Sequence, residues 1–548
     1  MKKRLCLFLA ILMVAFSCAG CTTQIFIKTV YETIVETKIV VETVVETVVE
    51  TVVVTEIVVE TVVETEVVVE TVIVTELVTA PETEPETEPE TDPKIELEIE
   101  TGAIGDALNA LGPIDYGGKT LGIICGGEGK NEVEGLNEMV DFEGGTAQVI
   151  NDAVYARNQA LEKFCNLKVS PIKVEDLDEK VRVEAMSPSR DFQFIDSTLD
   201  RAATIYATNA FLADWISLGI DLDQPWWDAG TADFLLEGSV YFMSGSANYV
   251  DDLLTYVIIF NKDMHKQYES TIANPYQSVR NNEWTLNYFY DVIQDVSCDS
   301  DGIEGFDELD TYGFVTNWEY GNTIFLGSGL RYIINDESVD RPTLYLSDAS
   351  RTEKALNVLD MACKIVHENN ATYMSPAGRE ILGVTAFQES RALFFGEAVT
   401  YVQKFNREMT VDCGILPVPK YDQAQENYIT WTHSLGTTCS IINTIPTYDR
   451  ETVGKIMSAY AILSHQYLRP AFYGTIVSDD PDSVEMMDMI FSNRVYDMAF
   501  YFRNTFAFEP IFKNCVVDNL DTFSASYESA SKNFDRKLNN LLKKLNKS

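Results

Sequence analysis

The sequence predicts an α/β protein with two lobes, carried on a low-complexity N-terminal segment. Short apolar runs alternate with helical patterns between residues 117 and 548, which is typical of sheets covered by helices. These residues number about 430, which is enough for two lobes with a core each. The repetitive segment before them has a very different composition and is predicted to lie outside that body.

Residues 1–20 are predicted to be a secretory signal. Lys2, Lys3 and Arg4 precede an apolar run over residues 5–16, and small residues follow, as in signal peptides. The sequence Cys-Ala-Gly-Cys that ends at Cys21 is similar to a bacterial lipobox. Cys21 is therefore predicted to carry the acyl (palmitate) anchor, with an ordinary cleaved signal and a free Cys21 as the alternative.

Residues 21–100 are predicted to form a stalk. Residues 28–79 are nearly all Val, Glu and Thr in short repeats. β-branched residues favour extended strands, whereas a four-residue period also suits a right-handed coil between chains, and both alternatives stay open. Residues 81–93, PETEPETEPETDP, add an extended proline-spaced linker.

Charge and cysteine usage exclude several classes of partner. The formal net charge of −44 disfavours binding to nucleic acid and to anionic lipid. The cysteines after residue 117 are scattered, and no Cys-x-x-Cys pair occurs among them. Neither a zinc site nor a disulfide framework is therefore indicated.

The first lobe is predicted to begin with alternating strands and one helix. Apolar runs predict strands over residues 118–125, 167–174 and 192–196, and an amphipathic pattern predicts a helix over residues 151–164. This alternation favours a parallel sheet covered on both faces. Residues 256–261, YVIIFN, predict a strand that crosses into the second lobe, followed by a helix over residues 262–268.

Later elements follow from the same patterns. Residues 386–420 predict a helix, a turn, a second short helix and an extended end, because Pro417 and Pro419 forbid a helix there. Strands are expected over residues 428–431 and 435–442. Helices are expected over residues 353–367, 449–463 and 523–545.

Several short motifs resemble those of family 1 extracellular solute-binding proteins, the ligand-capturing subunits of ABC importers. The motifs lie in the segments AFQESRALFFGEAVTYVQKF with CGILPVPK, LDQPWWD, NEWTLNYF and the region 483–501. Ser390 and Arg391 depart from the Gly-Lys that is usual in the family. The resemblance implies a periplasmic-binding-protein-like fold with a hinge and an inter-lobe cleft, in which 117–250 plus 385–440 form lobe 1 and 251–384 plus 441–548 form lobe 2.

Candidate ligand-binding residues follow from the chemistry of sugars. Aromatic faces cover C–H patches, and carboxylates or amides bind hydroxyl groups. The candidates are Trp226, Trp227, Asp251, Asn317, Trp318, Glu397 and Trp431. Tryptophan also packs in protein cores, so a structural role is the alternative for each ring.

An acidic loop between residues 299 and 310 partly matches a calcium-binding loop. A twelve-residue calcium-binding loop has oxygen ligands at positions 1, 3, 5, 7, 9 and 12. The matching positions are held by Asp299, Asp301, Gly305 (through its carbonyl), Asp307 and Asp310. Ile303 stands at the fifth position and cannot ligate through its side chain, so an acidic turn without an ion is the alternative to a structural Ca²⁺.

The resemblance implies a substrate-binding lipoprotein of an ABC importer rather than an enzyme. It would sit on the extracellular face of a bacterial membrane through its lipid anchor, capture a sugar or oligosaccharide by hinge closure and deliver it to permease subunits. A surface-anchored adhesin or sensor and a two-carboxylate glycosidase are the alternatives. No nucleophile, metal or phosphate-loop motif supports an enzyme.

Overall fold

The computed structural model describes residues 25–29, 39–47, 51–59, 102–126, 148–300, 302, 305–336, 341–477 and 480–545. The chain divides into two compact units, Met1–Glu96 and Leu97–Ser548, and each is described by itself. The predicted signal peptide and Cys21 lie outside the described residues, so both stay predictions.

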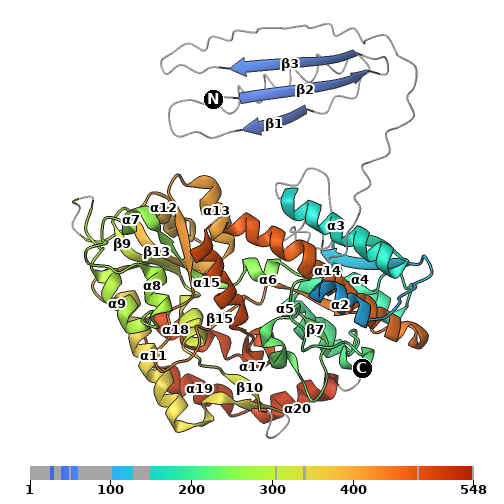
Figure 1. Ribbon diagram of the computed structural model, residues 1–548. Coiled ribbons are helices and arrows are strands. Elements are labelled where there is room, and N and C mark those ends of the chain that lie inside the picture. The colour runs from blue at the N-terminus through green and yellow to red at the C-terminus, as the bar shows by residue number, and fades with distance from the viewer. Residues whose placement is uncertain are drawn as a thin grey trace, which may run out of the picture. The chain divides into compact units, whose positions relative to one another are not determined.

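The described residues of the first unit form three antiparallel strands. They are β1 (Ile25–Thr29), β2 (Ile39–Thr47) and β3 (Thr51–Val59), paired in that order (Figure 1). Most of these residues belong to the Val/Glu/Thr repeats. In these segments the extended alternative is observed, as the β-branched side chains favour.

The second unit contains two five-stranded sheets, one in each lobe (Figure 1). The first sheet has the order β5-β4-β6-β16-β7. Its strands are β4 (Thr120–Gly126), β5 (Lys168–Val174), β6 (Phe194–Thr198), β7 (Phe242–Met243) and β16 (Thr437–Ile441). β4 is parallel to β5 and β6, whereas β16 is antiparallel to β6 and β7.

The second sheet has the order β12-β9-β13-β8-β14. Its strands are β8 (Tyr256–Asn261), β9 (Tyr312–Asn317), β12 (Thr372–Ser375), β13 (Ala392–Ala398) and β14 (Cys413–Leu416). β9 is parallel to β12 and β13, and β8 is antiparallel to β13 and β14.

Both sheets are therefore mixed, not purely parallel as the strand and helix alternation predicted. In each sheet one antiparallel strand arrives from the other lobe: β8 follows first-lobe residues, and β16 follows second-lobe residues. The prediction that residues 256–261 cross into the second lobe is confirmed.

The sheet assignments correct the predicted division of the lobes. Residues 385–440 were expected in lobe 1, but β13 and β14 pair with β8 and β9 of the second sheet. Residues 441–548 were expected in lobe 2, but α14 (Arg450–Ile476) packs along α3 (Gln148–Cys165) of the first lobe. The chain crosses between the lobes more often than the motifs could indicate.

The segment 386–420 also contains a strand where a helix was predicted. α12 (Ile381–Gln388) ends before Ser390, which has a left-handed φ of 56°, and β13 then begins at Ala392. Phe394 and Phe395 point into different hydrophobic clusters, as alternation along a strand requires. The short helix α13 (Thr400–Glu408) and the extended end at β14 agree with the prediction.

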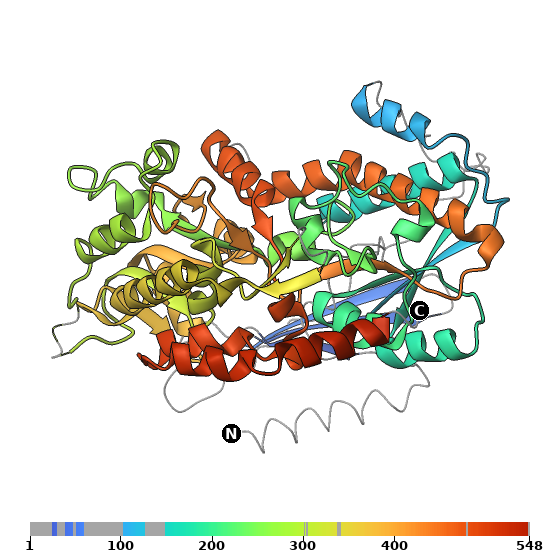
Figure 2. The ribbon, with the colours of Figure 1, turned by 90° about the horizontal axis from the view of Figure 1, so that it is seen from below.

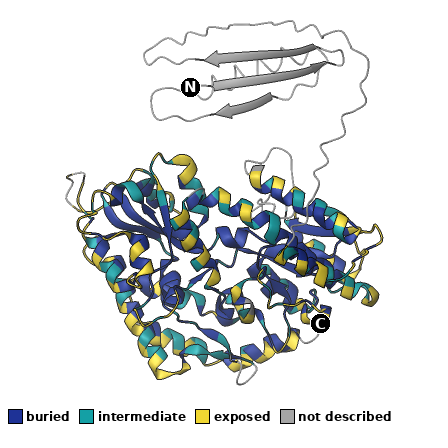
Figure 3. Ribbon diagram, in the orientation of Figure 1, coloured by how far each residue is buried: buried dark blue, intermediate teal, exposed yellow. Residues whose placement is uncertain are grey.

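Helices cover the sheets, and their outer faces are the exposed surface (Figure 3). The helices not yet introduced are α2 (Ala103–Ala110), α4 (Leu177–Met186), α5 (Leu199–Arg201), α6 (Val250–Leu253), α7 (Lys262–His265), α8 (Pro275–Arg280), α9 (Leu286–Gln294), α10 (Tyr320–Gly327), α11 (Ala349–His367), α15 (Pro481–Ser492), α16 (Met498–Tyr501), α17 (Arg503–Phe506), α18 (Glu509–Val517), α19 (Phe523–Ser531) and α20 (Phe534–Leu545). Residues 523–545, predicted as one helix, form two.

Two small sheets and the C-terminal helices connect the lobes. β15 (Thr430–Trp431) is parallel to β17 (Arg494–Val495), and β10 (Ile333–Asp336) is antiparallel to β11 (Arg341–Leu344). α18 packs on α10 and α11 of the second lobe, and α20 packs on first-lobe residues 207–209. Figure 2 shows these C-terminal helices, in red, running from the second lobe to the first.

Among the described helices, none combines the length and the hydropathy that a membrane-spanning segment requires.

Candidate functional site

Polar side chains gather where two neighbouring parallel strands of the second sheet end. Asn317 is the last residue of β9, and Glu397 is the penultimate residue of β13. Asn317 donates a hydrogen bond through Nδ2 to Glu397 Oε2, and the Ala398 amide donates to Glu397 Oε1 at 3.0 Å. In α/β proteins ligands bind outside the carboxyl ends of the strands, so this end of the sheet is the expected binding edge.

A second group of charged residues comes from the residue before α10 and from α18. Glu319 precedes α10, while Glu509 and Lys513 lie one turn apart on α18. Lys513 Nζ donates to Glu319 Oε1 at 2.6 Å and also to Glu509 Oε1. Asn322 Nδ2 donates to Glu319 Oε2 at 2.9 Å. The buried lysine is thus held between two carboxylates.

Trp318 supplies an aromatic face beside these charges. Its side chain is only half-buried, and Lys513 Nζ lies 4.0 Å from the ring centroid, within the range of a cation–π contact. We call Asn317, Trp318, Glu319, Glu397, Glu509 and Lys513 the polar cluster. It combines an accessible ring with carboxylate, amide and ammonium groups, which is the chemistry expected of a polyhydroxyl site.

Burial changes the ionisation of two carboxyl groups of the polar cluster. Glu397 is 8 % exposed, and its burial raises the pKa of its carboxyl to about 8. Burial also raises the pKa of Glu319, against the opposing effect of Lys513. A carboxyl group with a pKa of about 8 is largely protonated at neutral pH, so Glu397 can donate a hydrogen bond to a ligand as well as accept one.

A charged pair follows one strand of the first sheet. Asp200 comes just after the carboxyl end of β6 and accepts from Arg503 Nη2 at 2.7 Å and from Thr198 Oγ1 at 2.7 Å. Burial, together with the charges of Arg503 and Lys513, lowers the pKa of His433 to about 4. The charges of this pair and those of Glu509 and Lys513 all act on His433.

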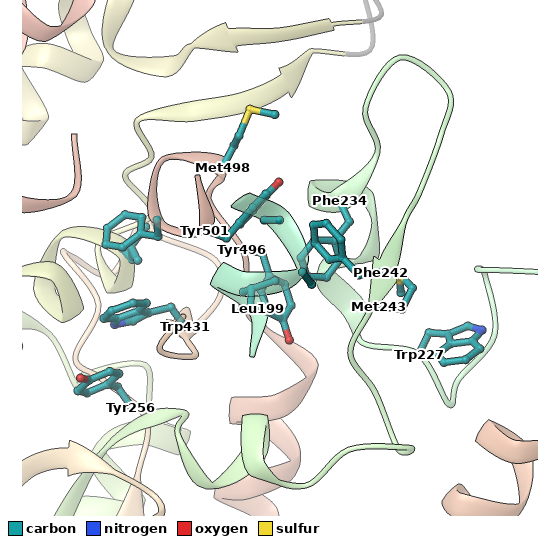
Figure 4. Packing of buried hydrophobic residues seen from close by; sticks show 14 of the residues in the cluster. Leu199, Trp227, Phe234, Phe242, Met243, Tyr256, Trp431, Tyr496, Met498 and Tyr501 are labelled. Atoms are coloured by element: carbon teal, nitrogen blue, oxygen red, sulfur yellow. The ribbon is translucent and has the colours of Figure 1, made fainter. Parts of the chain in front are cut away.

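Trp431, a predicted ligand-binding residue, lies in the core. It is 3 % exposed, stacks on Tyr256 with ring centroids 4.9 Å apart and contacts Phe500 with centroids 5.1 Å apart. Its Nε1 donates to Thr323 Oγ1 at 3.1 Å. Figure 4 shows Trp431 beside Tyr256 and well apart from Trp227. Its ring is occupied by packing, which corrects its prediction as a ligand-stacking face.

Trp226 and Trp227 lie away from the polar cluster and are also buried, with 8 % and 5 % exposure. Trp227 packs edge-on against Trp215 with centroids 5.3 Å apart, and its Nε1 donates to the Asp221 carbonyl at 3.0 Å. Trp227 nevertheless lines a separate cavity of about 660 Å³. The structure therefore does not bring the two predicted tryptophans together with Asn317, Trp318 and Glu397.

Asp251 belongs to a buried ionic network rather than to the polar cluster. It is 1 % exposed and lies 3.1 Å from Arg494 Nη2. The same guanidinium contacts Asp228 at 2.6 Å and Asp252 at 2.7 Å. The Asp251 carboxylate is thus buried and paired with Arg494, which corrects the prediction that Asp251 is available to a ligand.

The acidic loop binds its own backbone. Asp310 is fully buried, and its carboxylate accepts from the amides of Ser300 at 2.7 Å and Asp307 at 2.9 Å. Asp299 accepts from the Gly302 amide at 3.1 Å. Asp301 lies outside the described residues, and the described ones contain no cluster of three potential metal ligands. The calcium site stays a prediction.

Sequence reasoning missed Glu319, Glu509 and Lys513. Glu509 and Lys513 have the i, i+4 spacing of a helical ion pair, but almost 200 residues separate them from Glu319. No local pattern reveals that α18 would lie against α10. Glu319 directly follows two predicted site residues, which was the only available signal.

Several solved structures are similar to this chain at low sequence identity. A crystal structure of the cyclic α-maltosyl-1,6-maltose binding protein from Arthrobacter globiformis is similar, with a TM-score of 0.51, 13% identity, 78% of this chain and 100% of that chain covered. The GacH receptor of Streptomyces glaucescens has a TM-score of 0.46, 11% identity, and coverage of 77% and 99%. An ABC substrate-binding protein from Listeria monocytogenes in complex with cycloalternan has a TM-score of 0.44, 12% identity, and coverage of 78% and 98%.

The protein has the α/β, two-lobed, periplasmic-binding-protein-like fold that the sequence predicted. No family model and no curated protein matches the sequence.

Proposed function

We propose that this chain is the extracellular substrate-binding lipoprotein of an ABC importer, and that it captures a neutral sugar or oligosaccharide at the polar cluster. The observation that carries the proposal is the half-buried Trp318 between hydrogen-bonding groups at the carboxyl ends of β9 and β13. The two-lobed fold and the sugar-binding proteins of similar structure support it.

The charge of the polar cluster favours a neutral ligand. Glu319 and Glu509 share the single ammonium of Lys513, and Glu397 is mostly protonated at neutral pH. An anionic sugar would add a negative charge where carboxylates already exceed cations, which costs free energy in a partly buried site. Hydroxyl groups can accept from Asn317 or Glu397 and donate to the carboxylates.

Closure of the lobes would complete the site. Asp200, which follows β6 of the first sheet, pairs with Arg503, and the charges of this pair and of Lys513 act on His433. A ligand held on Trp318 would gain further hydrogen bonds if the first lobe approached. Hinge closure around a ligand is a common mode of domain motion.

Thermal unfolding of the full chain against a panel of sugars tests the proposal. The panel pairs neutral mono- and oligosaccharides with uronic acids of the same size. A neutral sugar well above its Kd should raise stability by about 3 kcal/mol, without conversion of the sugar. Trp318→Ala should lose that shift, whereas Tyr155→Ala, which removes an exposed ring on α3, should keep it.

Conversion of the sugar by the wild-type chain would favour the glycosidase alternative, with Glu319 and Glu397 as the first carboxyl groups to replace. A flat sugar panel would favour the adhesin or sensor alternative.

Anchoring through Cys21 and delivery to permease subunits are parts of the same proposal. In a bacterial host, labelled palmitate should enter the wild-type chain and not a Cys21→Ser variant, because the thiol is the acylated group. Retention of label in the variant would contradict the anchor and leave the ligand-binding proposal intact.

A further inference from the structure

A cavity of about 320 Å³ lies in the first lobe, at the amino ends of β4 and β6. Thr120 begins β4, and Phe192 and Gln193 come just before β6. The rest of the wall comes from the segment before β4, from Arg190 and from residues 444–449, which lead from β16 into α14. Ligands of α/β proteins bind at the carboxyl ends of strands, where the polar cluster lies, so this cavity is a separate place.

Arg190 lines the cavity from a strained turn. Its φ of 65° is in the left-handed region, which is costly for a residue with a Cβ atom. The buried carboxylate of Glu184 fixes the turn, because it accepts from the amides of Arg190 at 2.6 Å and Ser189 at 3.2 Å. Gln193 Nε2 donates to the Arg190 carbonyl at 3.3 Å. Strained residues that several contacts hold in place are concentrated at functional sites.

The guanidinium of Arg190 has no counter-charge. Arg190 is exposed, and no carboxylate of the described residues lies within ion-pair distance of it. Asp191, its neighbour in the sequence, lies 3.7 Å from Lys180 Nζ. The other two charged residues of the lining pair with each other, since Lys119 Nζ lies 3.2 Å from Asp449 Oδ1. The cavity therefore offers one unpaired positive charge, which favours a guest with a single negative charge.

An apolar surface lies beside this charge. Tyr116, Phe192 and Ile445 line the cavity and are buried. Tyr448 also lines it, but is 75 % exposed. A guest with an aromatic ring would cover the exposed ring of Tyr448, and both the loss of apolar surface from water and the contact between rings would stabilise the complex.

The size of the cavity and the geometry of arginine narrow the guest further. The volume is near the lower end of the range of small-molecule sites, about 300–1,000 Å³, which suits a molecule with one ring. A guanidinium binds a carboxylate through two parallel N–H···O bonds. The hydroxyl groups of Thr120 and Thr444, which also line the cavity, can bind a polar substituent on the ring.

We propose that the cavity lined by Tyr116, Arg190 and Tyr448 is a second binding site, specific for a small aromatic monocarboxylate. The carboxylate pairs with Arg190, and the ring lies against Tyr448. Arg190 repels a cationic analogue, a neutral analogue leaves the guanidinium without a partner, and an aliphatic acid leaves Tyr448 exposed. The site does not depend on the proposed function, because its guest contacts the first lobe alone.

Titration calorimetry of the full chain tests this site with probes that separate charge from ring. Benzoate and 4-hydroxybenzoate carry both features. Acetate carries the charge alone, benzyl alcohol carries the ring alone, and benzylamine carries the ring with the opposite charge. We expect saturable binding of at least one aromatic acid, and binding at least about tenfold weaker for the other three probes.

Two substitutions show whether the acid binds in this cavity. Arg190→Gln removes the unpaired charge, and Tyr448→Ala removes a ring that is mostly exposed. Each should weaken binding of the aromatic acid about tenfold or more. Arg182→Gln, at an exposed arginine of α4, and Tyr155→Ala, at an exposed ring of α3, are the matched controls and should leave binding unchanged.

Saturable binding of neither aromatic acid would overturn the second site. Equal binding of acetate, benzyl alcohol or benzylamine would do the same, as would binding that either cavity variant retains at full strength. Trp318→Ala should keep the binding of the aromatic acid, and its loss there would assign the acid to the polar cluster and overturn this inference. Binding of the acid that depends on Arg190, in a chain that binds no sugar, would remove the proposed function and keep the second site.

Discussion

At the scale of single residues, burial sets the protonation of the candidate site. It raises the pKa of Glu397 to about 8 and lowers the pKa of His433 to about 4. In both cases the charged form loses hydration that the surroundings do not replace. Near neutral pH both side chains are mainly uncharged, so the site presents hydrogen-bonding groups with little added charge.

Glu397→Gln should change how stability depends on pH. The folded pKa lies above the ordinary value of 4.5, so between about pH 4.5 and pH 8 the unfolded chain binds fewer protons. The contribution of Glu397 to the free energy of unfolding therefore falls as pH rises through this window, by up to about 1.4 kcal/mol per pH unit. His433, whose folded pKa is about 4 against an ordinary value of 6.5, contributes the opposite slope below about pH 6.5. Glu397→Gln lacks this contribution of Glu397, so its free energy of unfolding minus that of the wild type should rise with pH across the window, which urea unfolding at several pH values measures.

Glu426→Gln, at an exposed position, is the control and should keep the wild-type slope. If Glu397→Gln follows the wild-type curve throughout the window, the carboxyl group is not protonated as described.

At the scale of elements, one buried guanidinium joins the segments that cross between the lobes. Arg494 lies on β17, donates to Asp252 of α6 at 2.7 Å and to Thr255 Oγ1 at 2.9 Å, and contacts Asp228 of the first lobe. β17 pairs with β15, and Thr432 beside β15 donates to the Asp251 carbonyl at 2.7 Å. Three crossing segments thus meet at Arg494.

Arg494→Met should be strongly destabilising. It leaves three buried carboxylates without their shared cation, and breaking such a buried ionic network by removing one partner costs about 3–5 kcal/mol. Arg503→Met, which removes the more exposed partner of Asp200, should cost less than about 1 kcal/mol. Equal losses in the two variants, measured by denaturant unfolding, would show that Arg494 does not tie the segments together.

The acidic loop over residues 299–310 gives a second prediction at this scale. Asp310→Ala leaves the amides of Ser300 and Asp307 without their acceptor, at a cost of about 1–3 kcal/mol for each amide that stays buried. We expect this loss in the presence of chelator as well as of calcium, because the contacts are internal. A wild-type melting temperature that rises with calcium would support the proposed ion, and a loss confined to calcium-containing buffer would contradict the internal role of Asp310.

How much the sequence could predict differs between elements and contacts. β8 was predicted at its observed bounds, because an isolated run of apolar residues defines a buried strand. β13 was misassigned to a helix. A short apolar run such as Leu393 to Phe395 fits the period of a helix as well as that of a strand, and only the turn at Ser390 decides between them. Asn317, Trp318 and Glu397 were found by residue type and motif. Their partner Lys513 and the burial of Trp431 depend on long-range packing, which no local pattern encodes.

At the scale of the whole molecule, the two lobes share a continuous apolar interior. One cluster of buried residues contains Phe194 of the first sheet, Phe394 of the second and Trp431 between them. Motion of one lobe against the other must therefore be concentrated in the crossing segments, since packed cores resist continuous deformation.

Titration calorimetry of the full chain with the neutral sugar that most raises its melting temperature tests the central claim most directly. We predict saturable binding without turnover, retained in Tyr155→Ala and weakened at least about tenfold in Trp318→Ala and in Asn317→Ala. Binding of equal strength in these two polar-cluster variants, with all variants folded, would show that the polar cluster is not the sugar site.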